Sequence, residues 1–173
     1  MEFKYKGYLN IAEDIHEENG ERIVREVMTK ESGNKTDECV AGVLYDPDKK
    51  KIYLANQYRP ASGSKLLEVV AGTMEKGENP QECFAREAME EVGFDIKYIE
   101  KVNTYYTSPG ITKEKIHLYI GVGERIEKGG GLDEENENIE VIEMPVFEFV
   151  NYNFDDMKSE LIKNIFKYEY TQR

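Results

Sequence analysis

Apolar runs separated by short polar segments predict mainly strands in the first half of the chain. The pattern predicts strands over 2–10 and 22–30, on either side of the turn signal "EENG". Residues 39–45, "CVAGVLY", are almost continuously apolar, which indicates a strand in the centre of a sheet. The polar turn "DPDKK" separates it from a strand over 51–60, and "KLLEVVAG" predicts a further strand that ends at Gly72.

The clearest helix is predicted over 80–92. Asn79 is a good N-cap, and the proline after it suits the first helical position. The apolar residues Phe84, Ala88 and Val92 recur at a spacing of four, which places them on one face. A glycine follows the last of them and can end the helix in the left-handed conformation.

The second half of the chain continues with strands and ends in a helix. Strands are predicted over 96–106, 115–123 and 139–149, and a loop rich in glycine and acidic residues precedes the last of them. Apolar positions recur at helical spacing over 155–168, at Met157, Leu161, Ile165 and Tyr168. Mixed strands with two helices predict an α+β fold or an α/β/α sandwich.

Composition restricts the class of protein. The length of 173 residues suits one domain, or one domain with a small appendage, and no apolar run reaches the ~20 residues of a membrane span. The first ten residues lack the apolar core of a secretory signal, so we expect a cytoplasmic protein. The two cysteines are too few for a disulfide framework or a zinc site. The net charge of −12 opposes binding to nucleic acid through a broad basic face.

Acidic residues are concentrated on the predicted helix over 80–92. Glu87, Glu90 and Glu91 fall at i, i+3 and i+4, so their carboxylates share one face and repel one another. A divalent cation would convert this repulsion into coordination, and hard oxygen ligands suit Mg²⁺ or Mn²⁺. Arg86 can reach Glu90 and orient it, and the turn before the helix can direct the Ala71 carbonyl at the same cation. The alternative is a solvated, charge-rich helix face.

The same stretch, "GTMEKGENPQECFAREAMEEVGF", resembles the Nudix box at every fixed position, from Gly72 to Phe94. Ala88 is smaller than the branched residue often found at its position. The resemblance implies a Nudix α/β/α sandwich with a mixed sheet, and hydrolysis of a nucleoside diphosphate linked to another group. It implies Glu87, Glu91 and the Ala71 carbonyl as metal ligands, and Glu90 as a further ligand, directly or through water.

Segments outside the box extend the resemblance over most of the chain. "NQYRP", "LLEVVAG" and "SPGITKE" are similar to the ADP-ribose pyrophosphatase branch, and the segment after "GGG" is similar to its GDP-mannose-hydrolysing members. Those enzymes are homodimers that exchange N-terminal strands, which implies a swapped β-subdomain over 1–37 before a Nudix domain over 38–173. The implied substrate contacts are Arg25, Arg59, Glu68, Pro109, Gly110 and Glu114. Arg25 would reach the substrate from the partner subunit; the alternative is that it forms only a surface or interface salt bridge.

The general base implied by the resemblance lies in the acidic loop, where Glu135 is the first candidate and Glu137 the second; Glu90 and Arg86 complete the catalytic set. The expected substrate is ADP-ribose, hydrolysed to AMP and ribose 5-phosphate, with GDP-mannose or another nucleotide sugar as the alternative. A non-catalytic ADP-ribose sensor and a hydrolase of oxidised nucleoside triphosphates are the other readings. Tyr105, Tyr106 and Tyr119 could stack on a purine, although core packing is the plainer interpretation.

Overall fold

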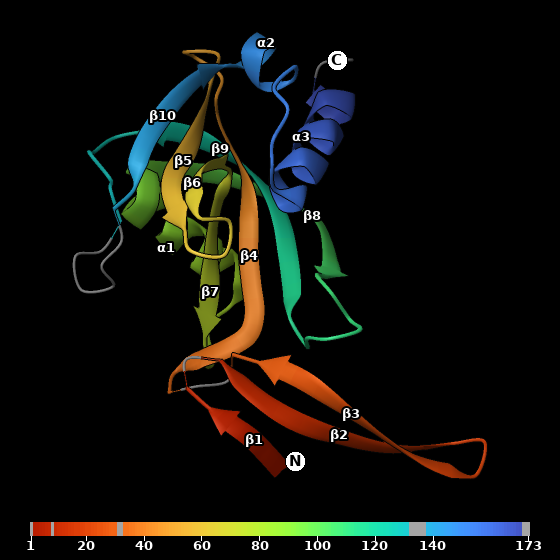
Figure 1. Ribbon diagram of the computed structural model, residues 1–173. Coiled ribbons are helices and arrows are strands. Elements are labelled where there is room, and N and C mark those ends of the chain that lie inside the picture. Colours follow the sequence, from red (N-terminus) through yellow and green to blue (C-terminus); the bar gives the residue numbers. More distant parts are fainter. Residues whose placement is uncertain (1, 8, 31–32, 132–137, 171–173) are drawn as a thin grey trace.

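The computed structural model describes residues 2–7, 9–30, 33–131 and 138–170 (Figure 1). A mixed sheet with helices on both faces forms the body, and a small separate sheet precedes it. The elements are β1 (Glu2–Lys6), β2 (Asn10–Glu18), β3 (Glu21–Thr29), β4 (Lys35–Asp46), β5 (Lys51–Arg59), β6 (Ser64–Glu68), β7 (Val70–Glu75), α1 (Pro80–Val92), β8 (Phe94–Tyr106), β9 (Lys115–Arg125), β10 (Glu140–Pro145), α2 (Val146–Phe149) and α3 (Met157–Tyr170).

The large sheet has the strand order β10-β5-β4-β9-β8, with β6 paired to β5 and β7 paired to β4. The neighbours β4 and β9 run parallel, and the other pairs are antiparallel. A hydrogen bond of 2.7 Å between His117 Nε2 and Glu38 Oε2 joins the parallel pair across 79 positions of sequence. The predicted α+β class with a mixed sheet is confirmed.

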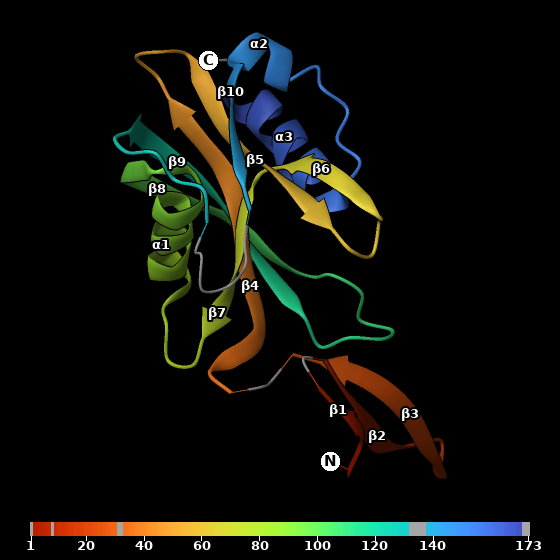
Figure 2. The ribbon, with the colours of Figure 1, turned by 60° about the vertical axis from the view of Figure 1, so that its left-hand side comes forward.

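Two hydrophobic cores lie on opposite faces of this sheet (Figure 2). On one face α1 contributes Phe84, whose ring stacks on Tyr119 of β9 with centroids 5.3 Å apart. On the other face α2 and α3 contribute Phe149 and Phe166, which meet edge to face at 5.8 Å. The sheet is therefore the middle layer of an α/β/α arrangement.

The N-terminal sheet has the order β1-β2-β3 and projects away from the body (Figure 1). Its long hairpin turns at Asn19 and Gly20, whose φ angles of 54° and 81° fit a two-residue type I′ turn. The prediction of one strand over 2–10 was wrong, because β1 ends at Lys6 and β2 begins at Asn10. The acid-rich segment after Asn10 has little strand propensity, and its pairing with all of β3 overrides that preference.

Backbone contacts join this sheet to the loop between β8 and β9. Met28 of β3 donates its N–H to the Ile111 carbonyl at 2.7 Å, and Lys113 donates to the Met28 carbonyl at 3.4 Å. Asp37 at the start of β4 is buried and accepts from the Thr29 hydroxyl at 2.5 Å. The base of the hairpin is thus fixed to the body while its tip extends beyond it.

Two predicted strands are divided differently in the structure. The strand over 65–72 breaks at Val69, whose N–H donates to Ser159 Oγ of α3 at 2.9 Å instead of joining a ladder. The strand over 139–149 ends at Pro145, which has no N–H for further pairing. The following turn is α2, which buries Phe149 completely.

The C-terminal helix does not bury the face predicted from the spacing of Met157, Leu161, Ile165 and Tyr168. Met157 and Tyr168 are 69% and 70% exposed, whereas Ile162 and Phe166 are buried against the sheet. The carboxylate of Asp156 accepts from the Ser159 N–H at 3.1 Å, so α3 begins after Asp156. Within the described residues, the helices are too short or too polar to cross a membrane.

Candidate active site

Local sequence signals set the position of α1, which carries most of the candidate chemistry. The Asn79 side chain accepts from the Gln81 N–H at 2.9 Å, and Gly93 ends the helix with a φ of 66°. With these ends fixed, the helix turns Phe84, Ala88 and Val92 into the core, as predicted. The carboxylates at positions 87 and 91 are then carried partly inward, beside the apolar stripe.

Glu87 and Glu91 are buried against β7, with exposed fractions of 8% and 2%. A Cβ atom added to Gly72 would lie 1.9 Å from the Glu87 carboxyl carbon, so only glycine leaves room for this side chain. Glu91 Oε2 accepts from the Ala71 N–H at 3.4 Å. The structure therefore brings both predicted ligands to the Ala71–Gly72 segment.

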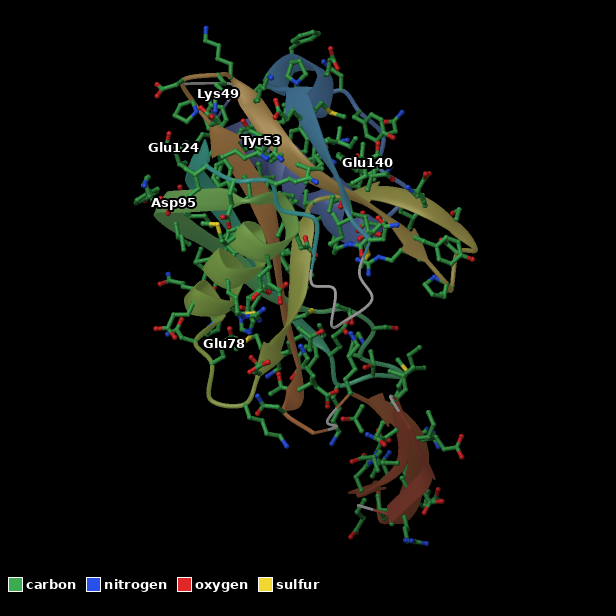
Figure 3. The ribbon with its side chains drawn as sticks, turned by 90° about the vertical axis from the view of Figure 1, so that its left-hand side faces the viewer. Lys49, Tyr53, Glu78, Asp95, Glu124 and Glu140 are labelled. Atoms are coloured by element: carbon green, nitrogen blue, oxygen red, sulfur yellow. The ribbon has the colours of Figure 1, made fainter. Side chains whose placement is uncertain are left out.

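Arg86 neutralises several of these carboxylates. Its Nε donates to Glu78 Oε1 at 2.9 Å, and its Nη1 lies 2.8 Å from Glu90 Oε2 and 2.9 Å from Glu87 Oε1. Glu78 in turn accepts from the Glu75 N–H at 2.9 Å, beside the loop that joins β7 to α1 (Figure 3). Glu90 is thus paired with Arg86, and Glu78 braces the loop.

The residues present fit a hard divalent cation in kind. The available donors are carboxylate oxygens, which Mg²⁺ and Mn²⁺ prefer, and they face the backbone at Gly72. In the part of the chain that the structure describes, no three His, Cys, Asp or Glu side chains converge closely enough to enclose a metal ion. Arg86 Nη1 contacts both Glu87 and Glu90.

A cavity of about 460 Å³ adjoins the Ala71–Gly72 segment. Its walls come from strands β4, β5, β7, β8 and β9, from adjoining loops, and from the start of α3. They consist of Lys30, Cys39, Val40, Arg59, Ala71, Gly72, Thr73, Tyr105, Tyr106, Thr107, Glu114, Ile116, Leu118, Asp156, Met157, Lys158 and Leu161. Of the residues predicted as substrate contacts, Arg59 and Glu114 line this cavity.

Glu68 lies behind the cavity and holds two of the cationic side chains that line it, Arg59 and Lys158. It is 2% exposed, accepts two hydrogen bonds from Arg59 at 2.9 and 2.7 Å, and accepts one from Lys158 Nζ at 2.6 Å. Burial opposes ionisation of Glu68, but the hydrogen bonds from Arg59 and the charge of Lys158 outweigh it and lower its pKa. The pKa of Arg59 is raised, first by Glu68 and further by the charge of Glu91, which links α1 to this cluster.

Three predicted contacts lie elsewhere. Arg25 is on the exposed part of β3, where its Nη1 donates to the Val24 carbonyl at 3.1 Å. Pro109 and Gly110 are exposed in the loop between β8 and β9, outside the residues that line the cavity. Their role in substrate binding stays a prediction, and a single chain does not bring them to the cavity.

Several cavity residues escaped the sequence analysis. Lys158 in the first turn of α3 and Asp156 just before that helix lie about 90 to 100 positions after Glu68 and Arg59, and no motif marks them. The capping pattern of Asp156 and Ser159 could have indicated that a helix N-terminus begins there. Tyr105 and Tyr106 are 37% and 56% exposed and line the cavity, so the core-packing interpretation was wrong for both.

The two candidates for the general base, Glu135 and Glu137, lie outside the described residues. The last described residues before them, Gly130 and Gly131, donate their N–H groups to the carbonyls of Glu91 at 2.8 Å and Glu90 at 3.0 Å. The described chain up to Gly131 therefore lies against the C-terminal end of α1.

Comparisons with known proteins agree with this arrangement. The family model described as the NUDIX domain matches residues 35–165. A GDP-mannose pyrophosphatase from Cronobacter sakazakii is 38% identical over 150 residues, covering 80% of this chain and 74% of that protein. A methanol dehydrogenase activator from Bacillus methanolicus is 32% identical over 141 residues, covering 81% and 72%. A solved ADP compounds hydrolase shares the fold with a TM-score of 0.77 at 18% identity, covering 99% of this chain and 91% of that one.

Proposed function

This chain belongs to the Nudix family of pyrophosphohydrolases, and we propose that it hydrolyses the diphosphate of a nucleoside diphosphate sugar with the help of a divalent cation, Mg²⁺ or Mn²⁺. The observation that carries the proposal is the position of Glu87 and Glu91. Both are buried at the Ala71–Gly72 segment, which also forms a wall of the cavity. A substrate in this cavity would present its diphosphate to these carboxylates.

The reaction class requires water to attack one phosphorus while the bond from that phosphorus to the bridging oxygen breaks. The products are a nucleoside monophosphate and a sugar phosphate, and the proton of the water leaves to a base. Negative charge accumulates on the phosphoryl oxygens, and a bound divalent cation would neutralise it. Glu87 and Glu91 are the proposed ligands, together with the Ala71 carbonyl, and Glu90 would join them directly or through water.

Arg59 and Lys158 are proposed to bind the diphosphate or the sugar phosphate from the side opposite the cation. Both line the cavity, and Glu68 holds both through hydrogen bonds. The buried carboxylate fixes where the two cationic groups lie before substrate arrives, which reduces the entropy lost on binding. Glu68 is thus a positioning residue in this proposal, and Arg59 and Lys158 are the contacts.

The substrate proposed first is GDP-mannose, with ADP-ribose second. The sequence alone favoured ADP-ribose, but the sequence relatives include GDP-mannose pyrophosphatases at 36–38% identity. The hydrolase of ADP compounds is 18% identical, a likeness that supports the fold alone. Hydrolysis of GDP-mannose would yield GMP and mannose 1-phosphate.

The remaining parts of the proposal rest on the sequence. Glu135, or else Glu137, would be the base that takes the proton from the attacking water. Residues 1–37 would form a subdomain that two copies exchange in a homodimer, before the Nudix domain over 38–173. Arg25 and the Pro109–Gly110 turn would reach substrate only in that assembly, which is consistent with their distance from the cavity lining of one chain.

A substrate panel with a matched pair of variants tests the proposal. We expect the wild type with Mg²⁺ to release a nucleoside monophosphate and a sugar phosphate from GDP-mannose faster than from ADP-ribose, UDP-glucose or NAD. Glu91→Gln should lower turnover about hundredfold or more, because the amide keeps the shape of the side chain but not its charge. Circular dichroism should show an unchanged fold, and Glu124→Gln, an exposed carboxylate on β9, should leave turnover unchanged.

Each outcome of the panel has a separate meaning. Turnover by Glu91→Gln equal to that of the wild type would contradict the proposed ligand set. Tight binding of ADP-ribose without hydrolysis, measured by calorimetry, would favour the sensor. Faster hydrolysis of ADP-ribose than of GDP-mannose would make ADP-ribose the preferred substrate, as expected from the sequence.

A further inference from the structure

One guanidinium serves three carboxylates on the edge of the candidate metal site. Arg86 Nη1 lies 2.9 Å from Glu87 Oε1 and 2.8 Å from Glu90 Oε2, so the same terminal nitrogen contacts both carboxylates. The other side of the guanidinium is held by Glu78, through Nε at 2.9 Å and Nη2 at 3.3 Å. One side of the guanidinium thus makes two hydrogen bonds to Glu78, and Nη1 on the other side contacts both Glu87 and Glu90.

The shared end is where a divalent cation would have to bind. Glu87 lies against Gly72 and faces the same backbone segment as Glu91. A cation bound by Glu87 would lie within a few ångströms of the guanidinium, and two positive groups at that separation repel each other strongly. Arg86 and the cation therefore compete for the carboxylate of Glu87.

From this geometry we infer that Arg86 is the resident counter-ion of the carboxylate cluster and that it must release Glu87 when a divalent cation binds. The inference rests on the proposed cation-dependent function and adds which contact is exchanged. Arg86 keeps Glu78 and Glu90 as partners, so it moves away from Glu87 without leaving the cluster. The strength of the Arg86–Glu87 contact then sets the cation concentration at which the site fills.

Glu78 is the anchor that makes this exchange possible. Its two oxygens accept from Arg86, and Oε2 also accepts from the Glu75 N–H at 2.9 Å, which fixes the carboxylate to the end of β7. Without Glu78 the guanidinium would turn wholly toward Glu87 and Glu90, and the cation would meet a stronger competitor. Glu78 and Arg86 therefore act on cation affinity in opposite directions.

A purely orienting role for Arg86 predicts the reverse. If the guanidinium only holds the carboxylates in place for the cation, removing it leaves the ligands disordered and cation affinity falls. Removing Glu78 would also lower affinity, because the orienting group loses its own support. The sign of the change in the Arg86 variant therefore separates the two roles.

The test measures Mn²⁺ binding directly, by the electron paramagnetic resonance signal of the free ion, in the absence of substrate. Arg86→Gln should tighten Mn²⁺ binding several-fold, and Glu78→Gln should weaken it several-fold. Lys51→Gln removes a cation from an ion pair with Glu143, at 2.7 Å and outside the cavity, and should leave binding unchanged. Weaker Mn²⁺ binding by Arg86→Gln would overturn the inference.

Thermal unfolding gives a second readout that does not depend on activity. Without a cation Arg86→Gln should unfold at a lower temperature than the wild type, because Glu78, Glu87 and Glu90 then repel one another. With Mn²⁺ its midpoint should rise by more than that of the wild type. If Arg86→Gln does not fold, Arg86→Lys replaces it, since lysine cannot contact all three carboxylates and should also tighten binding.

The outcomes distinguish this inference from the proposed function. Mn²⁺ binding by the wild type that weakens in both Arg86 variants would overturn the inference and leave the proposed function standing. Absence of Mn²⁺ binding in the wild type and every variant would overturn both. Binding that appears only when Arg86 is replaced would support the inference.

Discussion

At the scale of single residues, the candidate site depends on the absence of a Cβ atom at position 72. Gly72 has no side chain, and the Glu87 carboxyl group fills the space that a Cβ would take. The Nudix-box resemblance placed a glycine here without a physical reason. The structure supplies one, because any larger residue would collide with the carboxylate beside which the cation is proposed to bind.

Gly72→Ala should therefore abolish most divalent cation binding while the protein stays folded. The added methyl group would lie 1.9 Å from the Glu87 carboxyl carbon, so this flexible side chain must swing away from β7. Mn²⁺ binding followed by electron paramagnetic resonance measures the loss. The double variant Gly72→Ala with Glu87→Asp should regain part of the binding, since the shorter side chain relieves the collision. Wild-type binding in Gly72→Ala would contradict the steric argument.

A second residue-scale effect concerns the pKa of Glu160 on α3. The ammonium of Lys163, which is 4% exposed, donates to Glu160 Oε1 at 2.5 Å, and the Phe154 N–H donates to Oε2 at 3.1 Å. The contact with Lys163, followed by that with the Phe154 N–H, lowers the pKa of Glu160 to about 2. A lowered pKa means that the folded state favours the ionised carboxylate more than the unfolded state does.

Glu160 should thus stabilise the protein above its ordinary pKa and lose this effect as the pH falls from about 4.5 toward 2. Glu160→Gln should cost about 1 kcal/mol of unfolding free energy at pH 7, a modest value because solvent screens the carboxylate. Urea unfolding of both proteins across this pH range should show the difference shrinking. Glu148→Gln, an exposed carboxylate on α2, is the control. A difference independent of pH would contradict the assigned cause.

At the scale of elements, signals within a few residues predicted structure well, and signals that depend on distant partners did not. The helix over 80–92 was predicted with its observed bounds, because Asn79 and Gly93 act on neighbouring backbone groups. The break at Val69 could not be predicted, since its partner is Ser159 on another element. The grouping of Arg59 with Lys158 was hidden for the same reason, as Glu68 connects residues from two ends of the domain.

For the carboxylates of α1, local spacing predicted one property, and another depends on tertiary packing. Helical spacing placed Glu87, Glu90 and Glu91 together, and the structure confirms that they share one region of the helix. Spacing did not show that Glu87 and Glu91 are buried while Glu90 pairs with Arg86. That difference arises from how the helix packs on β7, a property of the tertiary structure and not of the helix alone.

At the scale of the whole molecule, the projecting hairpin exposes apolar side chains that a single chain does not cover. Ile15 and Val24 lie directly opposite each other on β2 and β3, and they are 51% and 37% exposed. A two-stranded ribbon that extends from the body gains little by exposing such a pair to water. The arrangement is consistent with the proposed homodimer, in which a second copy would cover this pair.

We expect the purified protein to run as a dimer in size-exclusion chromatography with light scattering. Replacing both Ile15 and Val24 by glutamate should shift it toward monomer, because charges on the hairpin cannot be buried without a partner. The same change at Ile126, which is 58% exposed between β9 and β10, should leave the assembly unchanged. A dimer that survives the double change would show that the hairpin tip is not part of the interface.

The parallel pairing of β4 with β9 has a consequence for how the molecule folds. Glu38 and His117, which hydrogen-bond across that pair, are 79 positions apart, and α1 lies in the chain between them. Closing a loop of that length costs about 4 kcal/mol of chain entropy before its contacts form. Local structure such as the capped helix and the N-terminal hairpin can form without that cost. The apolar face of α1, where Phe84 stacks on Tyr119 of β9, therefore completes its packing only after the slow, long-range closure of the central sheet.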